Sequence, residues 1–91
     1  MNEASGSFEV CNRLGLHARA ATKLVQLASR HSCEVFISRD GQSANAKSVM
    51  GVLLLCGAKG TRLLIEARGE GAARAVQEIG ELIENRFGEE E

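Results

Sequence analysis

Apolar and polar residues alternate along three stretches of the chain. The stretch SFEVCNR, residues 7–13, places Phe8, Val10 and Asn12 on one side, as in a half-buried β-strand. Residues 33–39 and 61–68 alternate in the same way. This pattern predicts three strands that each bury one face against a core.

Helical spacing marks two longer segments. Residues 18–29 and 71–87 repeat apolar side chains every three or four positions and carry charged residues on the opposite side. We expect the first of these helices to stop near Arg30, where basic residues suit a helix C-terminus. Gly80 interrupts the second helix and is expected to weaken it by about 1 kcal/mol relative to alanine.

Two shorter elements complete the prediction. Asp40-Gly41 is a residue pair that suits a tight hairpin, so we expect residues 42–46 to return as a short strand. Ser48 is a suitable N-cap for a short helix over residues 49–55.

The order of the elements is therefore βαββαβα. Right-handed crossovers place all the helices on one side of the sheet. We expect an α+β open-faced sandwich, with one four-stranded antiparallel sheet and three helices on one face. A chain of 91 residues forms a single domain, 1–91, with a core over about 7–87 and a frayed tail at 88–91.

Composition narrows the function classes. The core must be aliphatic, because aromatic residues are 3% of the chain and tryptophan is absent. No apolar run is long enough to cross a membrane, and residues 1–7 lack the features of a secretion signal. We therefore expect a cytoplasmic protein without membrane insertion.

Charge is unevenly distributed although the net charge is only −1. Residues 1–60 hold seven Lys and Arg against four Asp and Glu, whereas residues 61–91 hold four against eight. This balance argues against nucleic acid as a partner and favours an acidic protein partner for the first part. The scarcity of aromatic residues also argues against an RNA-binding module that stacks bases.

Three cysteines form an odd set without CxxC spacing, which is typical of reduced thiols. A metal site built from Cys11, His17 and Cys33 would lack its fourth ligand, so we expect no metal and no cofactor. Cys56 has no neighbouring base in the sequence that would activate it. The chain also lacks a phosphate-binding glycine–lysine loop and paired carboxylates, so we do not expect it to catalyse turnover alone.

His17 is placed by the pattern at the start of the first helix. The backbone N–H groups of Ala18, Arg19 and Ala20 have no partner within that helix, so they favour an anion and keep the imidazole neutral. Arg19 could then hold phosphate oxygens, and Arg13 could approach from the preceding strand. A solvated helix cap would explain the same position, and the short motif alone does not decide between these interpretations.

Two motifs at suitable spacing resemble the HPr family, the histidine-containing phosphocarriers of the phosphoenolpyruvate-dependent phosphotransferase system. They are NRLGLHARAATKLVQLA and KSVMGVLLLCGAKGT, and the resemblance runs from about residue 8 to residue 83. It implies that His17 takes a phosphoryl group on Nδ1 from Enzyme I and passes it to a IIA domain. It also implies that Arg19 steadies the phosphate and that Ser48 is phosphorylated by an HPr kinase/phosphorylase.

The resemblance further implies a docking surface. Its apolar part comprises Val49, Met50 and Leu53, and we expect Lys23 and Lys47 to supply positive charge beside it. A phosphate on Ser48 would then repel an acidic partner without unfolding the domain. We expect the protein to act as a monomer.

One position departs from the family. Ala20 stands where most members have proline, so we expect phosphorylation to survive with altered transfer kinetics. This departure gives some support to another function, in which the protein is mainly regulatory and its Ser48-phosphorylated form binds a transcription factor or an enzyme.

Overall fold

Four strands form one antiparallel sheet in the computed structural model, which describes residues 2–91. Their order across the sheet is β1-β4-β2-β3, and each neighbouring pair is antiparallel. The strands are β1 (Glu3–Glu9), β2 (Glu34–Arg39), β3 (Gln42–Asn45) and β4 (Arg62–Arg68).

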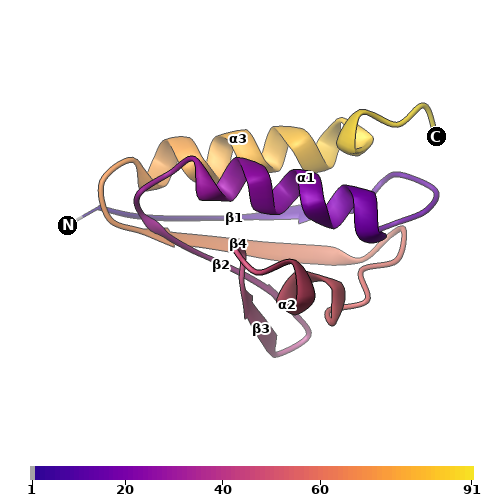
Figure 1. Ribbon diagram of the computed structural model, residues 1–91, viewed down its shortest axis with the longest axis horizontal. Coiled ribbons are helices and arrows are strands. Elements are labelled where there is room, and N and C mark those ends of the chain that lie inside the picture. Colours follow the sequence, from indigo (N-terminus) through magenta and orange to yellow (C-terminus); the bar gives the residue numbers. More distant parts are fainter. Residues whose placement is uncertain (1) are drawn as a thin grey trace.

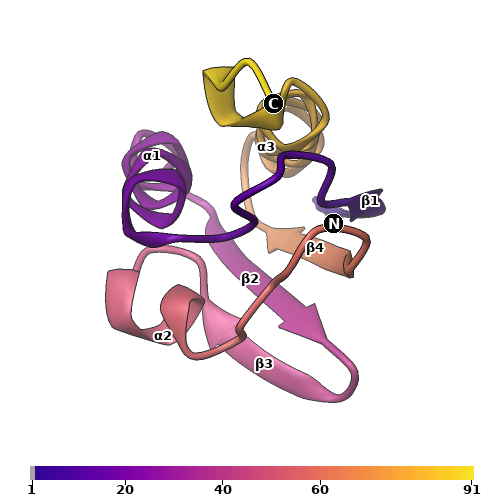
Figure 2. The same ribbon diagram turned by 90° about the vertical axis from the view of Figure 1, so that its right-hand side faces the viewer.

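Three helices cover one face of this sheet (Figure 1), and the view along the molecule shows the other face without a covering helix (Figure 2). They are α1 (Ala18–Ser29), α2 (Val49–Leu53) and α3 (Ala72–Glu84), and a 3-10 turn, η1 (Arg86–Gly88), follows the last of them. The predicted open-faced α+β sandwich with βαββαβα order is confirmed.

An aliphatic core lies between the sheet and the helices. Its largest fully buried side chain is Phe87, and the other large members are mainly leucine, isoleucine and valine. Gly80 has a packing role that its position in a helix did not reveal: a Cβ there would lie 2.3 Å from the ring of Phe8. The missing side chain lets this ring pack against α3, which offsets the helix-propensity cost.

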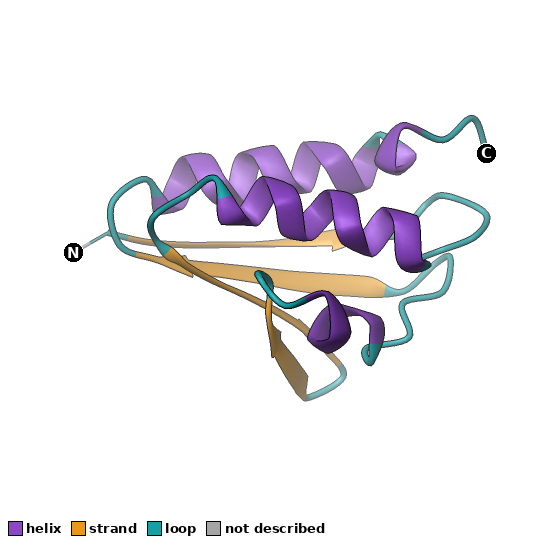
Figure 3. Ribbon diagram, viewed as in Figure 1, coloured by secondary structure: helices purple, strands orange, loops and turns teal. Residues whose placement is uncertain are grey.

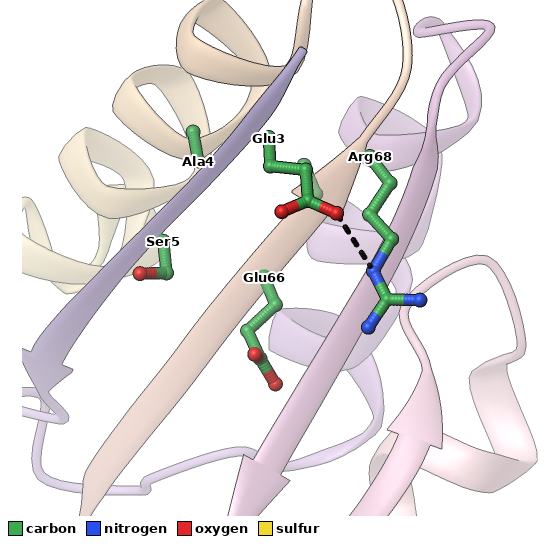
Figure 4. Close-up of a pocket in the computed structure, with 6 residues that line it drawn as sticks. Glu3, Ala4, Ser5, Glu66 and Arg68 are labelled. Carbon is green, nitrogen blue, oxygen red and sulfur yellow. Dashed lines mark ion pairs between the residues drawn. The ribbon is translucent and has the colours of Figure 1, made fainter. Parts of the chain in front are cut away.

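The uncovered face of the sheet is mainly polar, although it includes Leu64 of β4, which is 38% exposed. Glu3 and Ser5 of β1 lie beside Glu66 and Arg68 of β4 around a shallow hollow (Figure 4). Glu3 and Arg68 form an exposed ion pair at 3.7 Å. The hydrophobic core therefore lies on the helix-covered side of the sheet only (Figure 2).

The first strand begins earlier than predicted. We expected residues 7–13, but β1 covers Glu3–Glu9 and pairs with β4 from Glu3 opposite Arg68 to Glu9 opposite Arg62. The small residues between Glu3 and Phe8 carry little hydrophobic alternation, yet their backbone groups pair along the whole of β4. After Glu9 the chain leaves the sheet.

The hairpin and the first helix agree with their predictions. Asp40 and Gly41 have φ values of 48° and 83°, as a tight two-residue connection between β2 and β3 requires. α1 has the predicted bounds, Ala18–Ser29. Apart from β1 and the end of α3, the other elements differ from their predicted bounds by one or two residues.

The end of the chain differs most from the prediction. We expected a helix over 71–87, but α3 ends at Glu84, and Arg86 and Phe87 have left-handed φ values of 57° and 54°. We also expected residues 88–91 to fray; in the structure, Glu89 and Glu91 are hydrogen-bonded to the segment before α1. The C-terminus lies at the same end of the molecule as that loop (Figure 3).

Candidate functional site

His17 is the N-cap residue of α1. Its backbone is extended, with φ −77° and ψ 178°, and its carbonyl accepts the first bond of the helix from the Ala21 N–H at 2.8 Å. The N–H groups of Ala18, Arg19 and Ala20 precede that first helical bond, so they form the positive end of α1. The His17 side chain is 26% exposed. The predicted placement of the histidine at a helix start is confirmed.

The loop before His17 is fixed by a close backbone approach. Gly15 has φ +66°, and a Cβ at this position would lie 2.5 Å from the Gly57 carbonyl oxygen. The next residue, Leu16, is buried and donates its N–H to the same oxygen at 2.8 Å. Glycine is required here, and this contact joins the His17 loop to the segment that follows α2.

A carboxylate from the C-terminal tail reaches the imidazole. Glu89 Oε2 is hydrogen-bonded to His17 Nε2, and Glu89 Oε1 accepts from Asn12 Nδ2 at 2.9 Å. Asn12 is fully buried, and its Nδ2 also donates to the Gly15 carbonyl at 2.8 Å. Asn12 thus connects the loop before α1 to the tail.

The turn at η1 directs the tail to this position. Three consecutive residues with left-handed φ values, Arg86 to Gly88, turn the chain after α3, and the middle one, Phe87, is buried. Lys23 Nζ of α1 donates to the Phe87 carbonyl at 2.7 Å. Farther along, the Glu91 carbonyl accepts from the Arg13 N–H at 2.8 Å, and the two side chains form an exposed ion pair at 3.6 Å.

The tail carboxylate is held in its charged form. The hydrogen bond from His17, followed by the bond from Asn12, lowers the pKa of Glu89 below its ordinary value, and the nearby charge of Arg19 acts in the same direction. Glu89 is therefore an acceptor-only group at neutral pH.

Ser48 is the N-cap of α2, as predicted. Its Oγ accepts from the Gly51 N–H at 3.2 Å, and the residue is exposed. Beside it, Met50 is 69% exposed, whereas Val49 and Leu53 are half-buried and pack against the core.

The positive side chains of the expected docking surface differ in their availability. Arg19 is exposed, whereas both lysines are half-buried and bonded within the molecule. Lys23 holds the Phe87 carbonyl, and Lys47 Nζ donates to the His31 carbonyl at 2.7 Å. Of the three, Arg19 is the one whose side chain is exposed.

Sequence reasoning missed four residues near this end. Asn12 and Glu89 touch each other and the site, and Leu14 and Leu54 are large apolar side chains that are 58% and 71% exposed. Leu54 belongs to the apolar run VMGVLLL, residues 49–55, and lies directly after α2. Nothing in the short-range pattern linked Asn12 to a glutamate 77 positions later.

Other chemistry is sparse in the described part of the chain. Cys33 is buried, Cys11 is half-buried and Cys56 is exposed, and all three are free thiols. Within residues 2–91, no group of three or more His, Cys, Asp and Glu side chains is arranged to hold a metal ion. Over the same residues, no helix has the length and apolar character needed to span a membrane.

Comparisons with known proteins agree on one family. Residues 4–85 match the family described as PTS HPr component phosphorylation site. The chain is 47% identical over 81 residues to "Phosphocarrier protein HPr" of Xylella fastidiosa (strain Temecula1), covering 89% of this chain and 91% of the relative. It is 38% identical to "Phosphocarrier protein NPr" of Shewanella violacea, covering 98% of each. The crystal structure of HPr-C-His from Thermoanaerobacter tengcongensis matches with a TM-score of 0.90 and 37% identity, covering 100% of both chains.

Proposed function

The chain belongs to the HPr family of phosphotransferase-system phosphocarriers, and from this premise we propose that His17 accepts a phosphoryl group from Enzyme I and passes it to IIA domains. A phosphocarrier is not a catalyst: the chain is a substrate that is loaded by one protein and unloaded by another. We further propose that it acts as a monomer whose partners contact it one at a time.

The observation that carries this proposal is the position of His17 at the N-terminus of α1. A phosphoryl group on its Nδ1 would lie near N–H groups that have no acceptor inside the helix, at the positive end of the helix dipole. Arg19, in the first turn and exposed, supplies charge that can pair with phosphate oxygens. The His17 side chain is partly exposed, so a partner can reach its imidazole ring.

Labelled phosphoenolpyruvate tests this function. The protein is incubated with Enzyme I and the label, treated with acid, and in a parallel reaction mixed with a IIA domain. We expect label that is lost in acid and that moves to the IIA domain. Absence of label, or label that survives acid, would contradict a phosphohistidine carrier.

Ser48 is the proposed regulatory site. Its exposed hydroxyl caps α2 next to Met50, and a phosphate there would add about −1.5 to −2 charges at a helix N-terminus, which tolerates anions. The fold would remain, but an acidic partner that approaches Arg19 would be repelled.

A charge substitution tests this regulation. We expect Ser48→Asp to weaken binding to Enzyme I severalfold with little change in Tm, as measured by calorimetry, while Ser43→Asp on the exposed hairpin leaves binding unchanged. Equal affinities for the two variants would rule out an electrostatic effect at Ser48. Incubation with HPr kinase and ATP shows whether the serine itself is modified, since phosphoserine survives acid.

A further inference from the structure

The side chain of Glu89 makes a direct contact with the ring that the proposed function places at the centre of phosphoryl transfer. The carboxylate divides its two oxygens between His17 and Asn12. The side chain of Glu89 is only 13% exposed, whereas the neighbouring Glu90 and Glu91 are exposed. Of the three consecutive glutamates, Glu89 is the one whose side chain is held by hydrogen bonds to the site.

The contact determines where the ring carries its hydrogen. The pKa of Glu89 is lowered, so the carboxylate is ionised at neutral pH and can only accept hydrogen bonds. Nε2 of His17 must therefore donate. A neutral imidazole carries one N–H, so Nδ1 keeps its lone pair.

Nδ1 is also the ring nitrogen closer to the main chain, and the backbone of His17 leads directly into the N–H groups that open α1. In the opposite tautomer, Nδ1 would carry the hydrogen and would have no lone pair for phosphorus. The tautomer that Glu89 enforces is the one in which Nδ1 can act as a nucleophile.

We propose that Glu89 is a positioning residue for phosphoryl transfer, which holds the His17 ring in its Nε2–H tautomer and is itself aligned by Asn12. This inference rests on the proposed function of His17. During transfer the Nδ1 lone pair forms the bond to phosphorus, and the bond between phosphorus and the donor protein breaks, with its electron pair remaining on the donor. The Nε2 proton stays in place, and the positive charge that develops on the ring faces the Glu89 carboxylate.

Asn12 gives this arrangement its specificity. Its side-chain amide has two N–H groups, and both are used: one on the Gly15 carbonyl and one on Glu89 Oε1. Since Asn12 is buried, an amide without these acceptors would be costly. The loop before α1 therefore selects Glu89 and holds its second oxygen against His17.

The tautomer is measured on the unphosphorylated protein with ¹⁵N-labelled histidine. We expect a downfield Nε2–H proton resonance of His17 that is protected from exchange with water. It should persist in Glu90→Gln, which removes the same charge without touching the ring, and disappear in Glu89→Gln. Persistence of the resonance in Glu89→Gln would overturn the assignment.

Transfer kinetics provide the second measurement. We expect Glu89→Gln to slow phosphorylation by Enzyme I about threefold to tenfold, as for loss of one hydrogen bond to a reacting group, and Glu90→Gln to leave the rate unchanged. A chain that ends at Gly88 should match Glu89→Gln, since it retains the buried Phe87 and its fold. Faster phosphorylation of the shortened chain would show that the tail blocks the site. Equal phosphorylation rates in Glu89→Gln and Glu90→Gln would show that Glu89 has no effect on transfer. Either result overturns the proposal.

The two proposals fail in different ways. If His17 does not carry the phosphoryl group, no variant is labelled in the transfer assay, yet the Nε2–H resonance and its loss in Glu89→Gln remain. If Glu89 has no positioning role, labelling proceeds and the resonance is insensitive to the substitution.

Discussion

The two ends of α1 carry the same pair of side chains in opposite surroundings. At the start of the helix, His17 bonds through Nε2 to Glu89; just beyond its end, His31 bonds through Nε2 to Glu78 at 2.8 Å. In both cases the glutamate comes from the C-terminal part of the chain. Yet only the first histidine lies where a phosphoryl group would be stabilised.

Helix polarity accounts for this difference. The N–H groups at the start of α1 favour an anion, whereas the carbonyl groups at its end favour cations. Accordingly, the carbonyl of His31 accepts from Lys47 Nζ, and the His31 N–H donates to the Ala28 carbonyl at 3.1 Å. A histidine paired with a carboxylate is therefore not by itself a phosphoryl acceptor; the backbone donors beside it make the difference.

The glutamates also differ in their attachment. Glu78 lies within α3 and is held by Arg74 at 3.1 Å, so its pair with His31 joins the segment after α1 to α3. Glu89 follows the last buried residue, Phe87, and depends on Asn12 for its alignment. We expect the first pair to contribute to stability and the second to reactivity.

Replacing each histidine in turn gives the largest expected contrast. His17→Ala should abolish acid-labile labelling from phosphoenolpyruvate and Enzyme I, because it removes the proposed acceptor. His31→Ala should still be labelled, with a lower Tm. Label on the His17→Ala protein would place the acceptor elsewhere.

Replacing the two arginines near the helix ends gives a smaller contrast. Arg19→Ala should slow phosphorylation about tenfold to a hundredfold, the effect of losing a charged hydrogen bond to the transferred group. Arg30→Ala, at the C-cap of α1, should transfer at the original rate. Stopped-flow measurements with Enzyme I compare the two; equal rates would remove Arg19 from the site.

Removing the charge of Glu78 should separate stability from reactivity. Glu78→Gln should lower Tm by about 2–5 °C, because the carboxylate that holds the segment after α1 against α3 is lost. Glu81→Gln, on the exposed side of the same helix, should have no such effect. Thermal denaturation measures both, and the phosphorylation rates of both variants should equal that of the original chain.

Acid should weaken both histidine–glutamate pairs, and the loss of stability should be smaller for the pair of His17 and Glu89 than for the pair of His31 and Glu78. The hydrogen bond from His31, followed by that from Arg74, lowers the pKa of Glu78, and the bond from His17 lowers the pKa of Glu89. Each carboxylate thus contributes stability that is present above the ordinary Glu pKa of about 4.3 and is lost as the pH falls through the lower pKa of the folded state.

The dependence of Tm on pH between about 5 and 2 distinguishes these contributions. Glu78→Gln should flatten the curve visibly, and Glu89→Gln should flatten it less, since the tail contributes little to the core. A curve that is unchanged in Glu78→Gln would show that its pair with His31 does not stabilise the fold.

Local sequence patterns predicted the helices and strands that bury apolar side chains at regular spacing. The bounds of α1 and the turn at Asp40 and Gly41 followed from spacing and turn chemistry, and the single antiparallel sheet with its helices on one face followed from the order of the elements. The start of β1 did not, because Ser5 and Gly6 are held by backbone pairing with β4 rather than by burial of apolar side chains.

The candidate site divides in the same way. His17 and Ser48 were found because each opens a helix, which is a local property. Glu89 was missed because its partner lies 72 positions away and the contact depends on the left-handed turn at Arg86 and Phe87. The run of glutamates shows charge, but it does not show which member bonds to His17.

The most direct test of the account is a nuclear magnetic resonance spectrum of the protein after phosphorylation by Enzyme I. We expect Nδ1 of His17 to be bonded to phosphorus, the backbone amide protons of Ala18, Arg19 and Ala20 to move downfield, and the resonances of His31 to stay in place. Phosphorus on another atom, or unchanged amide protons at the start of α1, would contradict it.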